Sequence, residues 1–182
     1  MDELFLTPHS TVAMPRAYWL KEQPFYSAQV LLIRPSSVEL HRLLTAMDGK
    51  SPGDYDMEVV NRLYQHHCAV LPHRPYNLLS GEFKKSADQH EQYLGYPPDE
   101  EAWDGRKAIQ EAKYIHFSDW PLPKPWFQQP LDQQDREAPK CSSSSSGQED
   151  CTDRMIWFGL YVRWATDREV KNCLPNCFNR LY

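Results

Sequence analysis

The segment from His116 to Trp126 places an imidazole and an ammonium group on one short, proline-rich stretch. His116 ends an apolar run, where α/β proteins place ligand sites, and a neutral imidazole there can ligate a divalent ion such as Mn²⁺. Three prolines stiffen the backbone around Lys124, whose compact charge suits a phosphate. A metal ligand and a cation together are what a departing diphosphate requires. The residues also allow a simpler reading, a stiff surface loop whose aromatic side chains cover the core.

The elements that must position this segment alternate between apolar runs and helical patterns, which is typical of an α/β protein. Two local patterns indicate particular elements. The apolar run Val30–Ile33 predicts a strand buried on both faces, and Ser36 with Glu39 has the spacing of a capping box at the start of a helix. Asp54 or Asp56 is expected to cap the second helix. The predicted elements in chain order are strand 30–33, helix 37–47, helix 56–65, strand 68–71, helix 107–112 and strand 113–117.

The chain divides by composition into three parts. Residues 1–127 carry the strand and helix patterns, whereas residues 128–150 are rich in Gln and Ser and hold an unbroken serine run. Such a segment has nothing to fill a core, so we predict a disordered linker there. In residues 151–182, Ile156 and Leu160 recur at helical spacing, which predicts an amphipathic helix that packs back on the domain, followed by a tail.

Composition excludes several classes of function. The net charge of −5 and the absence of a basic patch exclude a typical nucleic-acid partner. No run of about 18 apolar residues predicts a transmembrane helix, and the first residues do not resemble a signal peptide. The cysteines leave two local pairings open, Cys141 with Cys151 and Cys173 with Cys177, and unpaired thiols are equally compatible.

Two further sets of side chains are candidates for sugar contacts. Trp103 and Trp120 have rings that can stack on a sugar face, and burial in the core is the alternative for each. Glu82, Lys84 and Lys85 follow Gly81 in a polar stretch and are expected to lie on a solvated surface rather than to line a binding site.

The His116 segment resembles the His-x-x-Gly-x-x-Lys-Pro-Trp signature of glycosyltransferase family 8, the glycogenin-like group, although its spacing is two residues longer and Asp119 stands in place of the Gly. Further stretches resemble the family in the same order along the chain. Within the family, the likeness is strongest to fungal N-acetylglucosaminyltransferases of the Golgi. The resembling stretches are residues 1–5, 30–36, 53–61, 71–79 and 113–126, and the likeness covers residues 1–126 nearly throughout and 151–170 weakly.

The resemblance implies the C-terminal part of a GT-A fold and retaining transfer of a sugar, GlcNAc by this likeness, from a UDP-sugar donor to a glycan acceptor, with Mn²⁺ as cofactor. It implies that His116 is a metal ligand and Lys124 a diphosphate contact. Asp56 matches a family carboxylate that contacts the sugar near the reacting carbon, a role that is compatible with capping a helix. The family likeness also implies the Golgi lumen.

Three departures from the family pattern bear on activity. Met57 replaces the Gln of an Asp-Gln pair, and Ser27-Ala28-Gln29 stands where many members have Asn-Ser-Gly, so that the Gln29 amide is expected to compensate in holding the donor. The nucleotide-binding half with its Asp-x-Asp motif is expected before Met1. We therefore expect the chain alone to be inactive. The alternatives are a non-catalytic remnant that binds glycan or a partner protein, and a structural protein unrelated to sugars.

Overall fold

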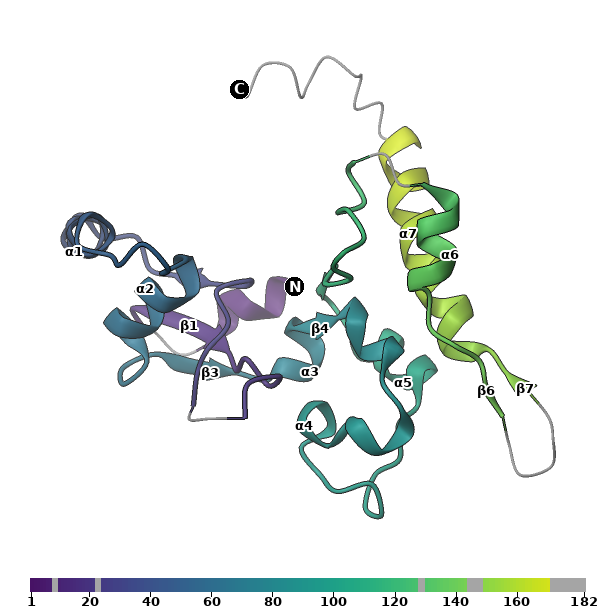
Figure 1. Cartoon of the computed structure of the whole chain (residues 1–182). Coiled ribbons are helices and arrows are strands. Elements are labelled where there is room, and N and C mark those ends of the chain that lie inside the picture. The colour runs from purple at the N-terminus through teal and green to yellow at the C-terminus, as the bar shows by residue number, and fades with distance from the viewer. Residues whose placement is uncertain (8–9, 22–23, 128–129, 144–148, 171–182) are drawn as a thin grey trace.

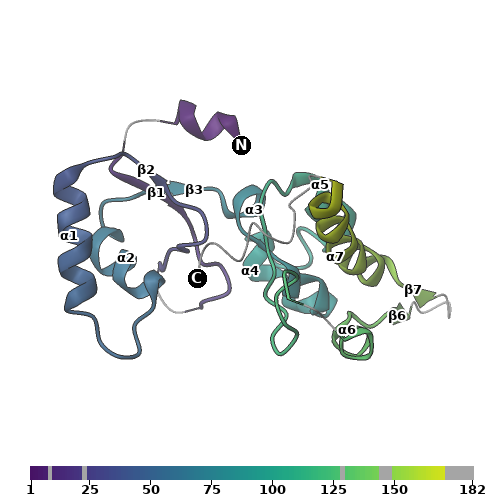
Figure 2. The ribbon, with the colours of Figure 1, turned by 90° about the horizontal axis from the view of Figure 1, so that it is seen from above.

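The computed structural model describes residues 1–182 except 8–9, 22–23, 128–129, 144–148 and 171–182. Its elements form two groups that lie beside one another in both views (Figures 1 and 2). Strands β1–β3 with α1 and α2 make one group, and β4 with α3–α7 makes the other. No helix in the described ranges is both long enough and apolar enough to cross a membrane. The architecture is mixed α/β, as the sequence predicts.

The first group is built on a three-stranded sheet with the order β2-β1-β3. The central strand β1 (Val12–Pro15) is buried along its whole length and runs parallel to β3 (Ala69–Leu71) and antiparallel to β2 (Leu32–Ile33). Val12 and Met14 pack with residues of α2 on one face, and the other face packs with the 3₁₀ helix η1 (Asp2–Leu6).

The strand predicted at 30–33 is shorter and less covered than expected. β2 comprises only the last two residues of the apolar run, lies at the sheet edge, and leaves Ile33 53% exposed. The prediction of burial on both faces is therefore wrong, because an apolar run does not reveal whether a strand is central or at an edge. Val70 of β3 is likewise exposed.

The two helices of this group form where the sequence predicts them. α1 (Ser37–Asp48) is capped by Ser36, whose hydroxyl accepts the Glu39 N–H at 3.3 Å. α2 (Asp56–Tyr64) has Tyr55 as its N-cap residue instead of Asp54 or Asp56, and the Tyr55 N–H donates to the Glu58 carboxylate at 2.9 Å. Asp54 accepts from the Ser51 N–H and from Arg62, so its carboxylate closes the preceding loop.

The second group surrounds a two-stranded parallel sheet, β4 (Leu78–Leu79) with β5 (Ile115–His116). A core of ten buried side chains holds these elements together, and Trp157 and Tyr161 of α7 belong to it. The amphipathic C-terminal helix thus packs back on the domain, as predicted. The remaining elements are α3 (His73–Tyr76), η2 (Ser80–Lys84), η3 (Ala87–Gln89), α4 (Glu91–Leu94), α5 (Gly105–Glu111) and α7 (Thr152–Val170).

The segment 128–150 differs from the predicted disordered linker in its described residues. It forms α6 (Leu131–Glu137) and the antiparallel pair β6 (Ser142–Ser143) and β7 (Glu149–Asp150). Between these elements, Ala138 is 7% exposed and belongs to the core of the second group. Composition did not reveal this, because Ala138 and Pro139 are buried and the segment is also held by contacts with distant residues.

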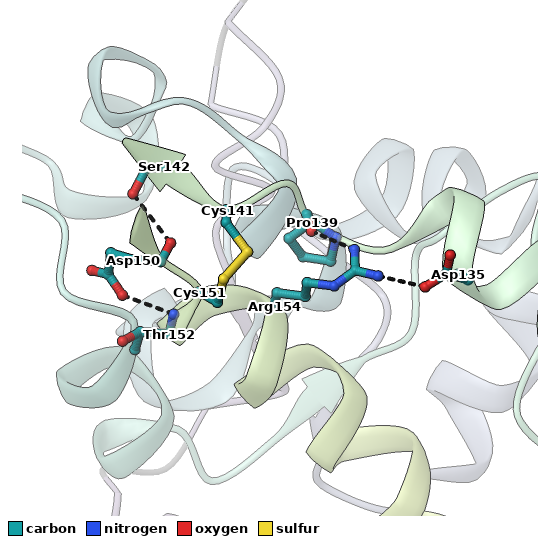
Figure 3. Close-up of a disulfide and its surroundings, with 8 residues drawn as sticks. All are labelled: Asp135, Pro139, Cys141, Ser142, Asp150, Cys151, Thr152 and Arg154. Atoms are coloured by element: carbon teal, nitrogen blue, oxygen red, sulfur yellow. Dashed lines mark hydrogen bonds and ion pairs between the residues drawn. A yellow bond between two sulfur atoms is a disulfide. The ribbon is translucent and has the colours of Figure 1, made fainter. Parts of the chain in front are cut away.

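A disulfide between Cys141 and Cys151 closes the β6–β7 hairpin at the start of α7 (Figure 3). This confirms one of the two pairings that the sequence left open; Cys173 and Cys177 lie outside the described residues. Arg154 reinforces the join, because its guanidinium donates to the Pro139 carbonyl at 3.0 Å and pairs with Asp135 of α6 (Figure 3). The hairpin and α6 are thereby tied to the first turn of α7.

Candidate functional site

The strongest candidate site lies where the chain leaves β5. His116 is paired with Leu79 of β4 in the parallel sheet, and the following loop turns back so that Lys124 reaches it. The Lys124 Nζ lies 3.3 Å from the His116 Nε2 and also donates a hydrogen bond to the Phe117 carbonyl. The structure therefore brings together the two side chains that the sequence assigns to a metal and to a diphosphate.

The electrostatics of the pair fix the state of the imidazole. Burial, together with the positive charge of Lys124, lowers the pKa of His116 to about 4, and the Asp119 charge opposes this only in part. Burial also lowers the pKa of Lys124, again against the attraction of Asp119. At neutral pH His116 is uncharged, so its Nε2 lone pair accepts the Lys124 proton, which assigns the ring proton to Nδ1.

Asp119 anchors the loop and is itself buried, with 4% of its surface exposed. Its Oδ1 accepts the Trp157 Nε1–H at 3.0 Å, and its Oδ2 accepts the Tyr161 hydroxyl at 2.8 Å and the Ser80 hydroxyl. The carboxylate thus joins the His116 loop to α7 and to the end of β4. Sequence reasoning marked Asp119 only as a departure from the family Gly, and its position between His116 and Lys124 gave no sign of this role.

Hydrogen bonds also join the residues that directly follow β4 and β5. The Ser118 N–H donates to the Ser80 hydroxyl at 2.9 Å, and the Gly81 N–H donates to the Ser118 hydroxyl at 3.0 Å. A Cβ atom at Gly81 would lie 3.0 Å from that same hydroxyl, which is tighter than ordinary packing. Gly81 therefore allows the two strand ends to approach closely, and this fixes the direction in which the His116 loop departs.

The other two predicted site residues are not part of this cluster. Asp56 is exposed in the first turn of α2, and Figure 1 shows α2 with the β1–β3 sheet, in the group that does not contain β4. Gln29 has a buried side-chain oxygen without a hydrogen-bond partner in the described part of the chain, while its N–H donates to the Ser27 hydroxyl at 3.2 Å. An unpaired buried acceptor costs about 1–3 kcal/mol, and because this oxygen is closed to solvent, a ligand could reach it only after the side chain turned outward.

The donor set fits a metal ion only in part. His116 offers one neutral nitrogen, but both Asp119 oxygens already accept hydrogen bonds from buried donors. Hard divalent ions such as Mn²⁺ require several oxygen ligands. One group of three potential ligands occurs in the described ranges, Cys141, Glu149 and Cys151, and the disulfide occupies its two sulfur atoms. In the described part of the chain, the loop therefore offers one nitrogen for a metal, from His116, and no set of oxygen ligands beside it.

A second buried carboxylate, Glu82, was missed at the sequence level. Instead of lying on a solvated surface, it is 1% exposed and accepts from the Tyr18 hydroxyl at 3.0 Å and from the His90 Nδ1 at 3.0 Å. Lys85 pairs with it at 2.9 Å, so the charge is compensated. Burial and the Glu82 charge raise the pKa of Tyr18. Glu82 stands between Gly81 and Phe83 and is followed by two lysines, and no local pattern shows that its carboxylate is buried whereas Lys84 is exposed.

Comparison with curated proteins shows where the chain has relatives. It is 45% identical over 177 residues to Glucose N-acetyltransferase 1 of Gibberella zeae, across 95% of this chain, and 39% identical to the protein of that name from Aspergillus fumigatus, across 93%. A protein of the same name from Candida albicans is 26% identical over 60% of the chain. No family model and no solved structure matches the chain.

These relatives confirm the resemblance to this fungal group of transferases over nearly the whole chain. The chain spans 37% of the Gibberella zeae protein and 47% of the Aspergillus fumigatus protein. The similarity therefore concerns a portion of the longer relatives, and it includes the His116–Lys124 loop and the α7 helix that anchors it.

Proposed function

We propose that this chain forms the diphosphate-facing part of a retaining sugar transferase of GT-A fold and glycosyltransferase family 8, which moves GlcNAc from a UDP-sugar to a glycan acceptor. The observation that carries the proposal is the neutral His116 imidazole 3.3 Å from the Lys124 ammonium at the end of β5. The relatives named Glucose N-acetyltransferase 1 support a transfer of N-acetylglucosamine. The Cys141–Cys151 disulfide supports an oxidising compartment such as the Golgi lumen.

In this mechanism Lys124 stabilises the leaving diphosphate. Negative charge develops on the diphosphate as the bond to the sugar breaks, and an ammonium group in a partly buried loop is worth more there than in water. A bound Mn²⁺ would supply further charge neutralisation, with His116 Nε2 as one ligand. Because one lone pair cannot serve both partners, His116 Nε2 would be free for a metal only if Lys124 gave up its contact with that nitrogen.

Asp56 and Gln29 act on the sugar side in this proposal. The exposed Asp56 carboxylate accepts hydrogen bonds from sugar hydroxyls, and the Gln29 amide holds the donor once its side-chain oxygen, which is buried and unpaired among the described residues, turns outward. Both side chains belong to the β1–β3 group, whereas His116 and Lys124 belong to the β4–β5 group. The donor sugar and its diphosphate would therefore be held by different groups of elements.

Titration of UDP in the presence of MnCl₂ tests the proposal on the chain itself. Lys124→Ala and His116→Ala should each weaken binding about tenfold, which corresponds to the loss of one charge-assisted contact. Lys107→Ala is a matched control, because Lys107 is 53% exposed and pairs with Glu101, away from the loop. Equal UDP affinity in all variants would contradict the assignment of the loop to the diphosphate.

A second candidate function is glycan binding without turnover by this chain. This function is favoured because both Asp119 oxygens already accept hydrogen bonds from α7. His116 is then the one potential metal ligand that the described loop offers. An assay of GlcNAc transfer from UDP-GlcNAc to a mannose oligosaccharide separates the two functions. Product above background supports the transferase; saturable oligosaccharide binding without product supports the binding function.

A further inference from the structure

The four residues Asp119–Leu122 form a turn with buried ends and an exposed tip. The Leu122 N–H donates to the Asp119 carbonyl at 2.7 Å and closes the turn. Asp119 and Leu122 are 4% and 5% exposed, whereas Trp120 between them is 88% exposed. The ends are fixed in the core of the second group, so the indole is held outward by the backbone on both sides.

This exposure follows from the anchors and not from a lack of order. Asp119 is tied to α7 and to Ser80, and Leu122 belongs to the ten-residue core. A rigidly presented indole loses little conformational entropy when a ligand covers it, which favours binding. Single exposed apolar residues are common on proteins, so the argument depends on the surroundings of Trp120.

Polar side chains border the turn. The Gln133 amide of α6 donates to the Pro121 carbonyl at 3.2 Å. Lys84 of η2 lies 3.2 Å from Glu137 and 3.8 Å from the Asp119 carboxylate. The turn therefore presents one large aromatic face, with the Gln133 amide on its Pro121 carbonyl and the Lys84–Glu137 ion pair on the neighbouring elements η2 and α6. An aromatic face with hydrogen-bond donors and acceptors at its edge matches a sugar ring, which is apolar on its C–H face and carries hydroxyls around its rim.

We propose that Trp120 is the stacking platform for a neutral pyranose ring of the acceptor, with the polar side chains of α6 on the side of the turn that Gln133 contacts. That this sugar is the acceptor rests on the proposed transferase function; the sugar binding itself requires no donor. The turn lies in the same loop as His116 and Lys124, so a ring on Trp120 is held near the diphosphate-facing pair.

The other tryptophans near the site are committed to contacts within the protein. Trp103 is stacked on His90 with ring centroids 4.0 Å apart and donates to Asp153 at 2.8 Å. Trp126 is 47% exposed and lies against Trp164 and Phe127. Of the two tryptophans that the sequence offered for stacking, the structure thus favours Trp120.

A lipid surface is the main competing ligand for an exposed indole, and local charge argues against it. The helix beside the turn, α6, carries three acidic residues and one basic residue, a net charge of −2. Anionic membranes attract basic segments and repel acidic ones. The sugar therefore fits the surroundings of Trp120 better than an anionic bilayer does.

The test is a titration of the whole chain with two neutral probes, mannotriose and cellotriose, in the absence of nucleotide. The unmodified chain should bind at least one probe saturably. Trp120→Ala should weaken that binding at least tenfold, and Trp120→Phe should retain part of it. Trp126→Ala is the control and should change it less than twofold, because that ring already packs against Trp164. Thermal unfolding should be unchanged in Trp120→Ala, since the indole is exposed.

Two outcomes overturn the proposal: neither probe binds, or Trp120→Ala binds them as the unmodified chain does. Trp120-dependent sedimentation with phosphatidylserine vesicles, without sugar binding, would overturn it in favour of a membrane contact. Failure of the transferase proposal is distinguishable, because UDP titration of Lys124→Ala reports on the diphosphate and not on Trp120. Sugar binding through Trp120 without UDP binding would leave a sugar site that serves no transfer.

Discussion

The two groups of elements differ in how much of their apolar surface they bury. In the β4–β5 group, ten buried side chains form one core, and two buried carboxylates inside it are matched by hydrogen-bond donors. In the β1–β3 group, α1 has no buried residue and leaves an apolar stripe in solvent. Leu40, Leu44 and Met47 form that stripe at helical spacing, and Val38 is exposed on the opposite side of the helix.

This difference shows where the candidate site obtains its rigidity. His116 and Lys124 lie in a loop whose anchor, Asp119, is held by Trp157 and Tyr161 of α7. A helix at the far end of the described chain therefore fixes the geometry of the pair. The other two proposed site residues, Asp56 of α2 and Gln29 in the loop before β2, lie in the β1–β3 group. Substitutions in the two groups should consequently differ in their effect on stability.

Truncation of Trp157 should produce the largest loss. This side chain is fully buried and donates to Asp119, so Trp157→Ala should destabilise the chain by about 3–5 kcal/mol. Urea denaturation measures the change. Val162→Ala on the same helix, at a side chain 64% exposed, is the control and should change stability by less than about 0.5 kcal/mol. Similar losses for both would show that α7 does not pack as described.

Removal of the Asp119 carboxylate should cause the second-largest loss of folding stability. Asp119→Ala leaves the Trp157 N–H and the Tyr161 hydroxyl buried without their acceptor, at a cost of about 2–4 kcal/mol. Asp119→Asn retains one acceptor oxygen and should cost less. UDP affinity measured beside urea denaturation separates the roles: a positioning role predicts weaker UDP binding in Asp119→Asn even at temperatures where the variant is fully folded.

Removal of the Cys141–Cys151 disulfide should lower the free energy of unfolding by an intermediate amount, and the loss should be confined to the second group of elements. Cys141 and Cys151 are separated by 10 residues in sequence, for which the chain-entropy relation gives about 3 kcal/mol. The Cys141→Ser, Cys151→Ser double variant should lose this amount and become insensitive to dithiothreitol. Hydrogen exchange should increase in α6 and the first turn of α7, while α1 and α2 are unaffected. Exchange that rises throughout the chain would contradict a local role.

The acid titration of His116 should give a smaller, pH-dependent effect. Its pKa is lowered from 6.5 to about 4 in the folded chain, so the unfolded chain binds more protons between these values. Stability should therefore fall as the pH falls from 6.5 towards 4. Nuclear magnetic resonance of the imidazole measures the pKa directly, and Lys124→Met should raise it by removing the neighbouring charge. A folded-state pKa near 6.5 would show that the pair is not formed.

The smallest effect is expected in α1. Leu44 is 50% exposed, so Leu44→Ala should change stability by less than about 0.5 kcal/mol in urea denaturation. A loss comparable to that of a core substitution would mean that the stripe on α1 is covered in solution, and the contrast between the two groups would then disappear.

Several features of this protein are determined by the sequence itself, because their causes are local. The cap of α1 at Ser36 and the spacing of α2 and α7 depend on residues three or four positions apart. The His116 and Lys124 pair was found in the same way, since both residues lie in one proline-stiffened segment. The assignments of Asp56 and Gln29 came from family resemblance, and they remain proposals.

Only the tertiary structure shows that Asp119 anchors the loop, that Glu82 is buried and that Trp120 is exposed. It also shows that residues 131–137 form a helix, α6, in a segment that the composition predicts to be disordered. Asp119 meets Trp157 and Tyr161 across 38 and 42 residues of sequence. Whether a carboxylate is solvated or buried among donors, and whether an indole points inward or outward, depends on which distant helix covers it. Local patterns specify how a segment folds, but the free energy of burying its side chains is set by partners that those patterns do not identify.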